Sequence, residues 1–194
     1  MNLSDFYLEF ENKFRGSREE IHKRLEAYDC LLTKISSSST VIKVLDIGCG
    51  RGEWLSKCSD LGFDCTGIEI NPLMANLCIE RGFQIYNDDA LNVLSNLPEG
   101  EFNIVSLFHV VEHISNKEIE NIFRECKRIL SPNGILILET PSIDNLTVSS
   151  RQFYLDPTHV NPINPDGLSF ILEYLGFDCA KYFFINPGQF VNDH

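Results

Sequence analysis

Three glycines at alternate positions lie near the first quarter of the chain, at the end of a run rich in Val and Ile. Gly48, Gly50 and Gly52 belong to the stretch Asp46-Ile-Gly-Cys-Gly-Arg-Gly. Glycine has no Cβ, so such a loop can turn tightly and let a ligand approach the backbone. In α/β proteins ligands bind just beyond the carboxyl ends of the strands. The spacing predicts a ligand-binding loop that a strand over 41–47 and a helix over 53–61 position.

Acidic side chains follow the next two predicted strands. Glu69 comes 23 residues after Asp46, and Asp88-Asp89-Ala90 follow the third strand. A carboxylate at the end of the second strand can accept both hydroxyls of a ribose, and the third position can receive an adenine amino group. Together these positions predict a site for an adenosine-containing cofactor. The predicted cofactor-binding residues are Arg15, Asp46, Gly48, Gly50, Gly52, Trp54, Glu69, Ile70, Asp88, Asp89, Ala90, Phe108 and His109.

Two kinds of cofactor fit a glycine turn with a distant acid. The dinucleotide fingerprint is G-x-G-x-x-G, but Glu53 occupies the position of the third glycine here. A carboxylate at a helix amino terminus competes with a pyrophosphate for the free N–H groups. S-adenosylmethionine (SAM) has no phosphate and tolerates acidic surroundings, so the sequence predicts SAM, with S-adenosylhomocysteine as its product. Singly, each acid could be a helix cap, and Asp88 or Asp89 is expected to cap the helix from Ala90.

Three histidines are expected beside the methyl group of SAM or in the wall of the acceptor pocket. His109 and His113 follow the fourth predicted strand, and His159 lies in a connection over 142–164. An alcohol acceptor needs a general base, so all three are candidate catalytic residues. A phosphate acceptor is already anionic and needs positive charge instead. Each histidine could equally be a hydrogen-bonded structural residue. The predicted substrate-binding residues are Arg18, Arg151, Tyr154 and His159.

One metal-binding alternative concerns His109-Val-Val-Glu112-His113, which matches the H-x-x-E-H motif of zinc peptidases. That motif requires a helix, whereas residues 102–110 have the apolar pattern of a buried strand, and no convincing third ligand follows. We therefore expect no metal ion at these residues.

Composition narrows the functional class. The 194 residues carry 16 Lys and Arg against 28 Asp and Glu, a net charge of −12. A chain this acidic is a poor general binder of nucleic acid or of anionic membranes. No apolar run approaches the roughly 18 residues of a membrane span, and the amino terminus lacks a signal-peptide pattern. The seven cysteines form no C-x-x-C pair, which suits reduced thiols. We expect a cytoplasmic protein without a nucleic-acid partner, compatible with an oligomer.

Alternating short apolar runs and helical stretches predict a doubly wound α/β fold with a mostly parallel, Rossmann-like sheet. Before it, Ser17 and Glu20 form a capping box, and apolar residues at helical spacing indicate a helical cap over 1–36. A hydroxyl-rich run over 36–40 separates this cap from a SAM-binding domain over 41–194. The strands are expected at 41–47, 64–70, 83–87, 102–110, 134–140 and 180–186, and the helices at 53–61, 72–81, 90–96, 117–130 and 165–175.

The stretch Val44-Leu-Asp-Ile-Gly-Cys-Gly-Arg-Gly52 resembles the first motif of class I SAM-dependent methyltransferases. Three further stretches resemble the methyltransferase domain of bacterial O-antigen chain-terminating proteins: Phe14–Ile21, Phe108–His113 and Tyr154–His159. The first resemblance implies a seven-stranded type of sheet, and the second implies methylation of a surface polysaccharide. The chain departs from both: its last strand is very short or the sequence is a fragment of a longer protein, and no kinase-like segment follows.

These observations favour a SAM-dependent O-methyltransferase of a bacterial surface glycan, acting on a sugar hydroxyl or a terminal phosphate in O-antigen or capsule biosynthesis. Two alternatives stay open. Members of the superfamily share the cofactor site and differ in the acceptor, so the acceptor could be a small metabolite. The same pocket could also bind SAM in a non-catalytic domain.

Overall fold

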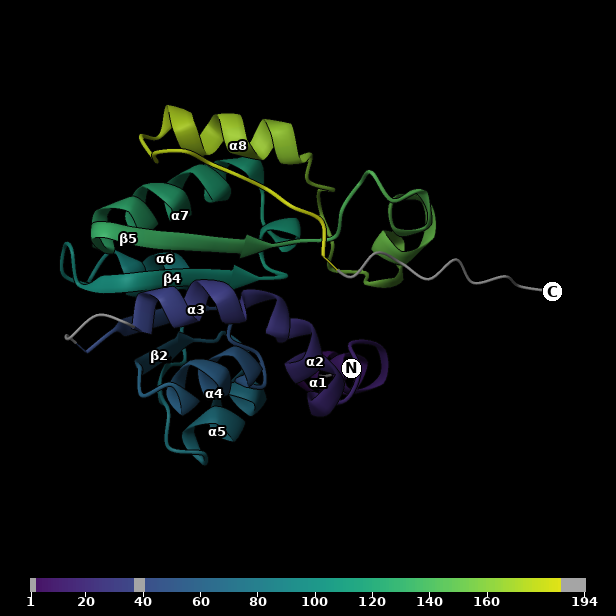
Figure 1. Ribbon diagram of the computed structural model, residues 1–194. Helices are drawn as coiled ribbons and strands as arrows, with labels where there is room; N and C mark the ends of the chain where they lie inside the picture. The colour runs from purple at the N-terminus through teal and green to yellow at the C-terminus, as the bar shows by residue number, and fades with distance from the viewer. Residues whose placement is uncertain (1–2, 37–40, 186–194) are drawn as a thin grey trace.

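Residues 3–36 and 41–185 are described by a computed structural model. Their strands form one sheet in the order β3-β2-β1-β4-β5, and every neighbouring pair is parallel. This arrangement confirms the doubly wound α/β fold (Figure 1). The strands are β1 (Lys43–Ile47), β2 (Asp64–Ile68), β3 (Gln84–Tyr86), β4 (Phe102–Phe108) and β5 (Leu130–Glu139).

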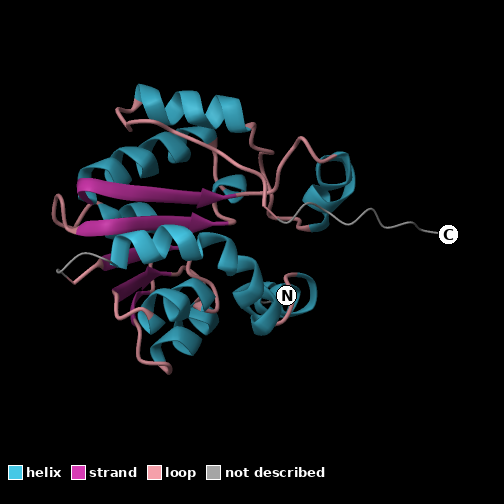
Figure 2. Ribbon diagram, viewed as in Figure 1, coloured by secondary structure: helices cyan, strands magenta, loops and turns pink. Residues whose placement is uncertain are grey.

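Helices cover both faces of the sheet because each inner strand alternates its side chains between two apolar cores (Figure 2). In β1, Val44 belongs to one core, and Leu45 and Ile47 belong to the other. The first core includes side chains of α3 (Asp29–Ser36), α4 (Glu53–Asp60) and α5 (Pro72–Ile79). The second includes α6 (Ala90–Leu94) and α7 (Asn116–Ile129), with α8 (Pro165–Tyr174) packed against it.

The amino-terminal helices are α1 (Leu3–Phe14) and α2 (Arg18–Leu25). The expected capping box forms: Ser17 N–H donates to Glu20 Oε2 at 2.7 Å, and Glu20 N–H donates to Ser17 Oγ at 3.2 Å. A 3₁₀ turn over Glu26–Tyr28 interrupts the helical stretch before α3. Tyr28 and Leu32 are buried in the first core beside Val44, so this segment packs directly on the sheet. In the predicted hydroxyl-rich run, residues 37–40 lie outside the described residues.

The strand expected at 180–186 is not present in the described residues of this segment. Residues 180–185 form no strand, and residue 186 lies outside the described part of the chain. A strand needs a hydrogen-bonded neighbour, but this segment makes no ladder with β5. Instead its aromatic side chains stay exposed, and the Tyr182 hydroxyl donates to Asp166 of α8 at 2.9 Å. The described sheet therefore has five strands rather than the seven of the expected type.

The connection after β5 differs from the plain loop expected over 142–164. It contains a π-helical turn at Val148–Gln152 and a 3₁₀ turn at Phe153–Leu155. This connection and the helices α1 and α2 lie beyond the carboxyl ends of the strands, where the arrowheads point in Figure 1. The site described below lies between them. Within the described residues, no helix is both long and apolar enough to cross a membrane.

Candidate active site

The glycine loop joins β1 to α4, and its backbone geometry requires glycine. Gly48 has a φ of 68°, and a Cβ at this position would lie 2.5 Å from Cγ2 of Val110. The N–H of Gly50 donates to Glu69 Oε2 at 2.8 Å, and Glu69 Oε1 accepts from the Asn71 N–H at 2.8 Å. Burial raises the pKa of Glu69. The carboxylate at the end of β2 therefore sits against the loop that follows β1.

Asp46 lines a cavity beside the glycine loop. Its side chain is buried, and the Ser106 hydroxyl of β4 donates to Oδ1 at 2.7 Å. Burial raises the pKa of Asp46 to about 7, although the Ser106 hydrogen bond and the charge of Arg15 oppose that shift. A carboxyl group in this setting is stabilised as an anion by a cationic group that enters the cavity.

Aromatic rings form one wall of the cavity. The ring centroids of Trp54 and Phe108 lie 4.8 Å apart, and Tyr28 makes edge contacts with both at 5.4 Å. The indole Nε1 of Trp54 is buried and has no hydrogen-bond partner within residues 3–36 and 41–185. A buried donor without an acceptor is uncommon in folded proteins.

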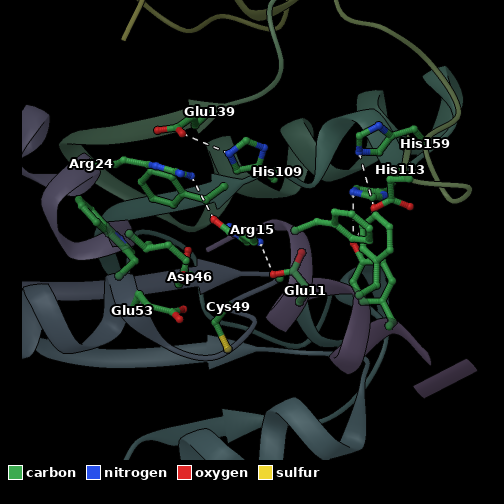
Figure 3. A pocket seen from close by; sticks show the side chains of 18 of the residues that line it. Glu11, Arg15, Arg24, Asp46, Cys49, Glu53, His109, His113, Glu139 and His159 are labelled. Carbon is green, nitrogen blue, oxygen red and sulfur yellow. Dashed lines mark hydrogen bonds and ion pairs between the residues drawn. The ribbon is translucent and has the colours of Figure 1, made fainter. Parts of the chain in front are cut away.

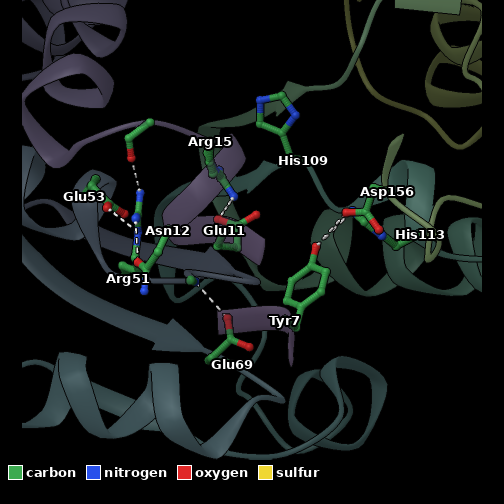
Figure 4. Close-up of polar contacts among 12 residues, drawn as sticks. Tyr7, Glu11, Asn12, Arg15, Arg51, Glu53, Glu69, His109, His113 and Asp156 are labelled. Atoms are coloured by element: carbon green, nitrogen blue, oxygen red, sulfur yellow. Dashed lines mark hydrogen bonds and ion pairs between the residues drawn. The ribbon is translucent and has the colours of Figure 1, made fainter. Parts of the chain in front are cut away.

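Arg51 fastens the amino-terminal helices onto the glycine loop (Figure 4). Its guanidinium donates to Asn12 Oδ1 at 3.0 Å and to the Gly16 carbonyl at 3.1 Å, and it pairs with Glu53 at 3.0 Å. The Arg51 side chain is buried. These contacts hold the end of α1 over the loop as a roof for the cavity.

Charged side chains of α1 and α2 enter the cavity from this roof (Figure 3). Arg15 pairs with Glu11 at 3.0 Å, and Arg24 donates to the Arg15 carbonyl at 3.2 Å. Burial opposes the charge of Arg15, but Glu11 and Glu53 keep its pKa above the ordinary value. Arg15 is therefore a cation whose charge acts on Asp46, and its assignment to the cofactor site stays a prediction.

His109 follows β4 in a left-handed conformation with a φ of 57°. Its Nε2 lies 3.2 Å from Glu139 Oε1, and its Nδ1 lies 3.3 Å from Glu112 Oε1. Burial lowers the pKa of His109, but the two carboxylates outweigh it and raise the pKa to about 9. The Tyr28 hydroxyl donates to the second oxygen of Glu139 at 2.7 Å. His109 is thus held as an imidazolium between two acids.

His113 is oriented by the connection after β5. Its Nδ1 lies 2.8 Å from Thr158 Oγ1, and that hydroxyl donates its single hydrogen to Asp156 Oδ1 at 2.6 Å. The Thr158 oxygen must therefore accept from Nδ1–H, which leaves the lone pair of a neutral ring on Nε2. Burial lowers the pKa of His113. The Nε2 atom lies 3.5 Å from the Tyr7 hydroxyl, inside the cavity.

His159 is oriented in the same way. Its Nδ1 lies 2.6 Å from the Phe153 carbonyl, which can only accept, so Nδ1 carries the hydrogen. Its Nε2 lies 3.9 Å from Asp156 Oδ2. The rings of His159 and His113 are 4.6 Å apart between centroids. Two imidazole rings thus present acceptor nitrogens to one side of the cavity.

The structure brings eight of the predicted residues into this one cavity. These are Arg15, Asp46, Gly48, Trp54, Phe108, His109, His113 and His159. Other predicted residues lie beside it or outside its lining: Gly50, Gly52, Glu69, Ile70, Asp88, Asp89, Ala90, Arg18, Arg151 and Tyr154.

Among the residues outside the lining, Asp89 has a defined local role. Its side chain accepts from Leu91 N–H at 2.9 Å and caps α6, so the expectation that Asp88 or Asp89 caps this helix is confirmed. Arg18 contacts Ser56 at 3.5 Å, and Tyr154 is exposed. Their functional assignments stay predictions.

The polar residues of the site that were not assigned from the sequence include Tyr7, Glu11, Glu112, Glu139 and Asp156. Glu139 ends β5, the same signal that identified Asp46 and Glu69. Tyr7 and Glu11 are four residues apart and share one face of α1.

Comparisons with known proteins agree with this architecture. The model of a family described as "Methyltransferase domain" matches residues 18–182. A SAM-dependent methyltransferase of known structure from Archaeoglobus fulgidus is 38% identical, with a TM-score of 0.80, over 89% of this chain and 74% of that chain. A Pyrococcus horikoshii protein is 20% identical with a TM-score of 0.65 over 84% of each chain, which supports the fold alone.

Curated relatives are similar at lower identity. A ubiquinone biosynthesis O-methyltransferase of Xanthomonas oryzae is 30% identical over 50% of this chain and 42% of its own length. A "probable S-adenosylmethionine-dependent methyltransferase" of Mycobacterium tuberculosis is 24% identical over 88% of this chain and 57% of its own length. The chain thus spans about half the length of these relatives.

The parallel sheet, the glycine loop and the acid after β2 define a Rossmann-like cofactor-binding protein. More narrowly, the chain belongs to the methyltransferase domain family, among the SAM-dependent methyltransferases.

Proposed function

We propose that this chain transfers the methyl group of SAM to an oxygen atom of its acceptor. SAM supplies a methyl group on a positively charged sulfur, and the C–S bond electrons stay on sulfur when the new O–CH₃ bond forms. The observation that carries the proposal is a pair of cavity-lining histidines, His113 and His159, whose Nδ1 hydrogen bonds leave the lone pair on Nε2. A neutral hydroxyl must lose its proton during transfer, and we propose that these nitrogens act on it.

The residues present fit SAM. The positive-φ backbone at Gly48 keeps the loop open to a ligand, and the buried Asp46 favours a cationic group such as the ammonium or sulfonium. The Arg15 cation suits the carboxylate, and Trp54 is proposed to line the cofactor site. Glu69 suits the ribose, and Ile70, Asp88, Asp89 and Ala90 are proposed for the adenine side.

His109 takes a different role in this proposal. With a pKa of about 9 and carboxylates at both ring nitrogens, it is protonated near neutral pH and cannot accept a proton there. We assign it to positioning the methyl side of the cofactor site and to offsetting the charges of Glu112 and Glu139. The action on the acceptor hydroxyl is left to His113 and His159.

The acceptor we favour is a saccharide hydroxyl of a bacterial surface glycan. The cavity walls carry Glu11, Glu53, Glu139 and Asp156. Of the lining cations, Arg15 and His109 are paired with acids, and Arg24 donates to the Arg15 carbonyl. An anionic phosphate is disfavoured by this surround, whereas a neutral hydroxyl is not. The glycan itself rests on the resemblance of the segments around Tyr154 and His159 to O-antigen chain-terminating enzymes. Arg18, Arg151 and Tyr154 are proposed to contact the chain of the glycan, under the roof formed by α1 and α2.

A small phenolic metabolite is the second candidate. The curated relatives include a ubiquinone biosynthesis O-methyltransferase, whose similarity covers half of this chain. The aromatic side chains of Phe10 and Phe14 of α1 line the same cavity and could contact a flat ring.

The test is methyl transfer from SAM with a radiolabelled methyl group. Purified protein is incubated with neutral oligosaccharides, the same oligosaccharides with a terminal phosphate, and a catechol. We expect label on the neutral saccharide and a loss of at least 100-fold in kcat for the His113→Ala variant. Label on catechol alone would favour the small-metabolite candidate. Binding of SAM without label on any acceptor would favour a non-catalytic domain.

A further inference from the structure

Two histidines that line the cavity lie close to a buried carboxylate. Glu112, His113 and His159 each offer one ligand atom, and these atoms all lie within 4.8 Å of one another. Glu112 and His113 belong to the 3₁₀ turn Val111–His113 after β4, whereas His159 comes from the connection after β5. Two segments far apart in the sequence therefore deliver three metal-ligating groups to one place.

The rings of His113 and His159 have the orientation that a metal ion requires. Histidine ligands almost always donate the second ring N–H to an oxygen acceptor, which fixes the tautomer and the direction of the lone pair. Here Nδ1 of His113 donates to Thr158 Oγ1 at 2.8 Å, and Nδ1 of His159 donates to the Phe153 carbonyl at 2.6 Å. Each Nε2 therefore keeps its lone pair, and the neighbour of His113 Nε2 is the Tyr7 hydroxyl at 3.5 Å.

Glu112 is fully buried, with an exposed fraction of 0%. Its Oε2 accepts from the Thr140 hydroxyl at 3.0 Å, but its Oε1 makes no hydrogen bond within the described part of the chain. The imidazolium of His109 offsets part of the Glu112 charge, with its Nδ1 3.3 Å from Oε1. Oε1 still lacks a hydrogen bond, so it can take a further cationic partner such as a metal ion.

We propose that Glu112, His113 and His159 bind a divalent transition metal ion that takes the acceptor hydroxyl as a further ligand. Two imidazoles and one carboxylate form a ligand set that zinc and similar ions use in catalytic sites with an open position. Bonds of about 2.0–2.2 Å require the three side chains to move closer than they are in the metal-free geometry. From the sequence we expected no metal, because the H-x-x-E-H motif requires a helix and no convincing third ligand follows it; the fold brings His159 to this place.

This inference rests on the proposed O-methyl transfer and states how the two histidines act in it. A bound cation lowers the pKa of a coordinated hydroxyl. The O–H bond breaks, its proton passes to solvent water through the open cavity, and the electron pair stays on the oxygen that attacks the methyl carbon. Tyr7, whose hydroxyl lies 3.5 Å from His113 Nε2 and 3.4 Å from Asp156 Oδ2, lies beside the incoming hydroxyl.

The test is calorimetric titration of the purified chain with Zn²⁺ and with Co²⁺, without SAM, together with the visible spectrum of the Co²⁺ complex. We expect one ion per chain and cobalt bands typical of nitrogen and oxygen ligands. The variants His113→Ala, His159→Ala and Glu112→Gln should each weaken binding by more than 100-fold. Thr158→Val should weaken it by roughly 10–100-fold, because it removes the partner of a ligand.

His22→Ala is the matched control, since His22 lies on α2 outside the cavity, and it should bind the ion as the unchanged protein does. Each variant is also titrated with S-adenosylhomocysteine, so that a misfolded variant is recognised by loss of both ligands. No ion bound by the unchanged chain, or equal binding by His159→Ala, would overturn the proposal. Methyl transfer that survives a chelator would overturn the metal and leave the proposed function intact. An ion bound at these residues without methyl transfer to any hydroxyl would overturn the proposed function and leave the metal site intact.

Discussion

The Nδ1 atom of His113 lies 2.8 Å from Oγ1 of Thr158, 45 residues further along the chain. The Thr158 hydroxyl in turn donates to Oδ1 of the buried Asp156 at 2.6 Å. The chain of three groups fixes the ring of His113 with its Nε2 in the cavity. It links the turn after β4 to the connection after β5, and the proposed chemistry depends on that link.

Thr158→Val removes the acceptor for His113 Nδ1–H and keeps the shape of the side chain. We expect kcat to fall by about 10- to 100-fold with little change in the KM for SAM, because the ring loses its fixed tautomer but the cofactor site is untouched. Steady-state kinetics with both substrates measure this split. Thr147→Val, an exposed change in the same connection, should leave both constants unchanged; an equal loss in the two variants would contradict the role of Thr158.

Gly48→Ala should abolish cofactor binding. Any L-residue with a φ near +68° costs about 1–2 kcal/mol, and the added Cβ would also lie 2.5 Å from Val110. Gly100→Ala is a close control, because Gly100 has a φ of 69° and open space around its missing Cβ. Thermal unfolding and S-adenosylhomocysteine titration of both variants separate the two effects. A Gly48→Ala variant as stable and as active in binding as Gly100→Ala would show that the loop is not packed in this way.

The pKa of Asp46, raised to about 7 by burial, predicts a pH dependence. Because the folded state holds this proton above the unfolded pKa of 3.8, the ligand-free protein should lose stability as the pH rises from about 4 to 7. The ammonium group of S-adenosylhomocysteine beside Asp46 favours the ionised carboxylate, so affinity should rise several-fold between pH 6 and 7.5. The groups that act on this proton are Ser106, Arg15, Glu69 and Glu53.

The Asp46→Asn variant should bind more weakly and lose this pH dependence, whereas Asp60→Asn, at the exposed end of α4, should keep it. Calorimetric titrations at four pH values provide the measurement. If Asp46→Asn retained the full pH dependence, the titrating group would be a different one.

Arg51→Met should loosen the roof of the site. The change removes the hydrogen bonds from Arg51 to Asn12 and Gly16, and these contacts join α1 to the glycine loop. We expect faster hydrogen exchange in residues 3–16 with little change in the sheet, because the strands keep their own ladders. Arg124→Met, on the exposed face of α7, is the control. Uniformly faster exchange across the sheet would mean that Arg51 supports the whole fold instead.

The sequence predicted the fold where local pattern and tertiary structure agree. Strand and helix alternation gave the doubly wound sheet, and the Ser17–Glu20 capping box marked the start of α2. The predicted strand over 180–186 was wrong because alternating apolar residues cannot show whether a neighbouring strand is available to pair.

The site was predictable only where its residues follow directly from the order of strands and helices. Acids and glycines at strand ends follow directly from the topology, so Asp46, Gly48 and Glu69 could be named in advance. The partners of His113 and His159 could not, since they depend on how residues 142–164 fold back over β4. The roof contact of Arg51 with Asn12 spans 39 residues and has no local signal.

The central claim is that this cavity binds SAM and its product, and calorimetric titration with S-adenosylhomocysteine beside NAD tests it most directly. We predict one S-adenosylhomocysteine per chain with micromolar affinity, loss of that binding in Gly48→Ala, and no binding of NAD. Binding of NAD alone, or binding of S-adenosylhomocysteine that is unaffected by Gly48→Ala and Asp46→Asn, would contradict the account.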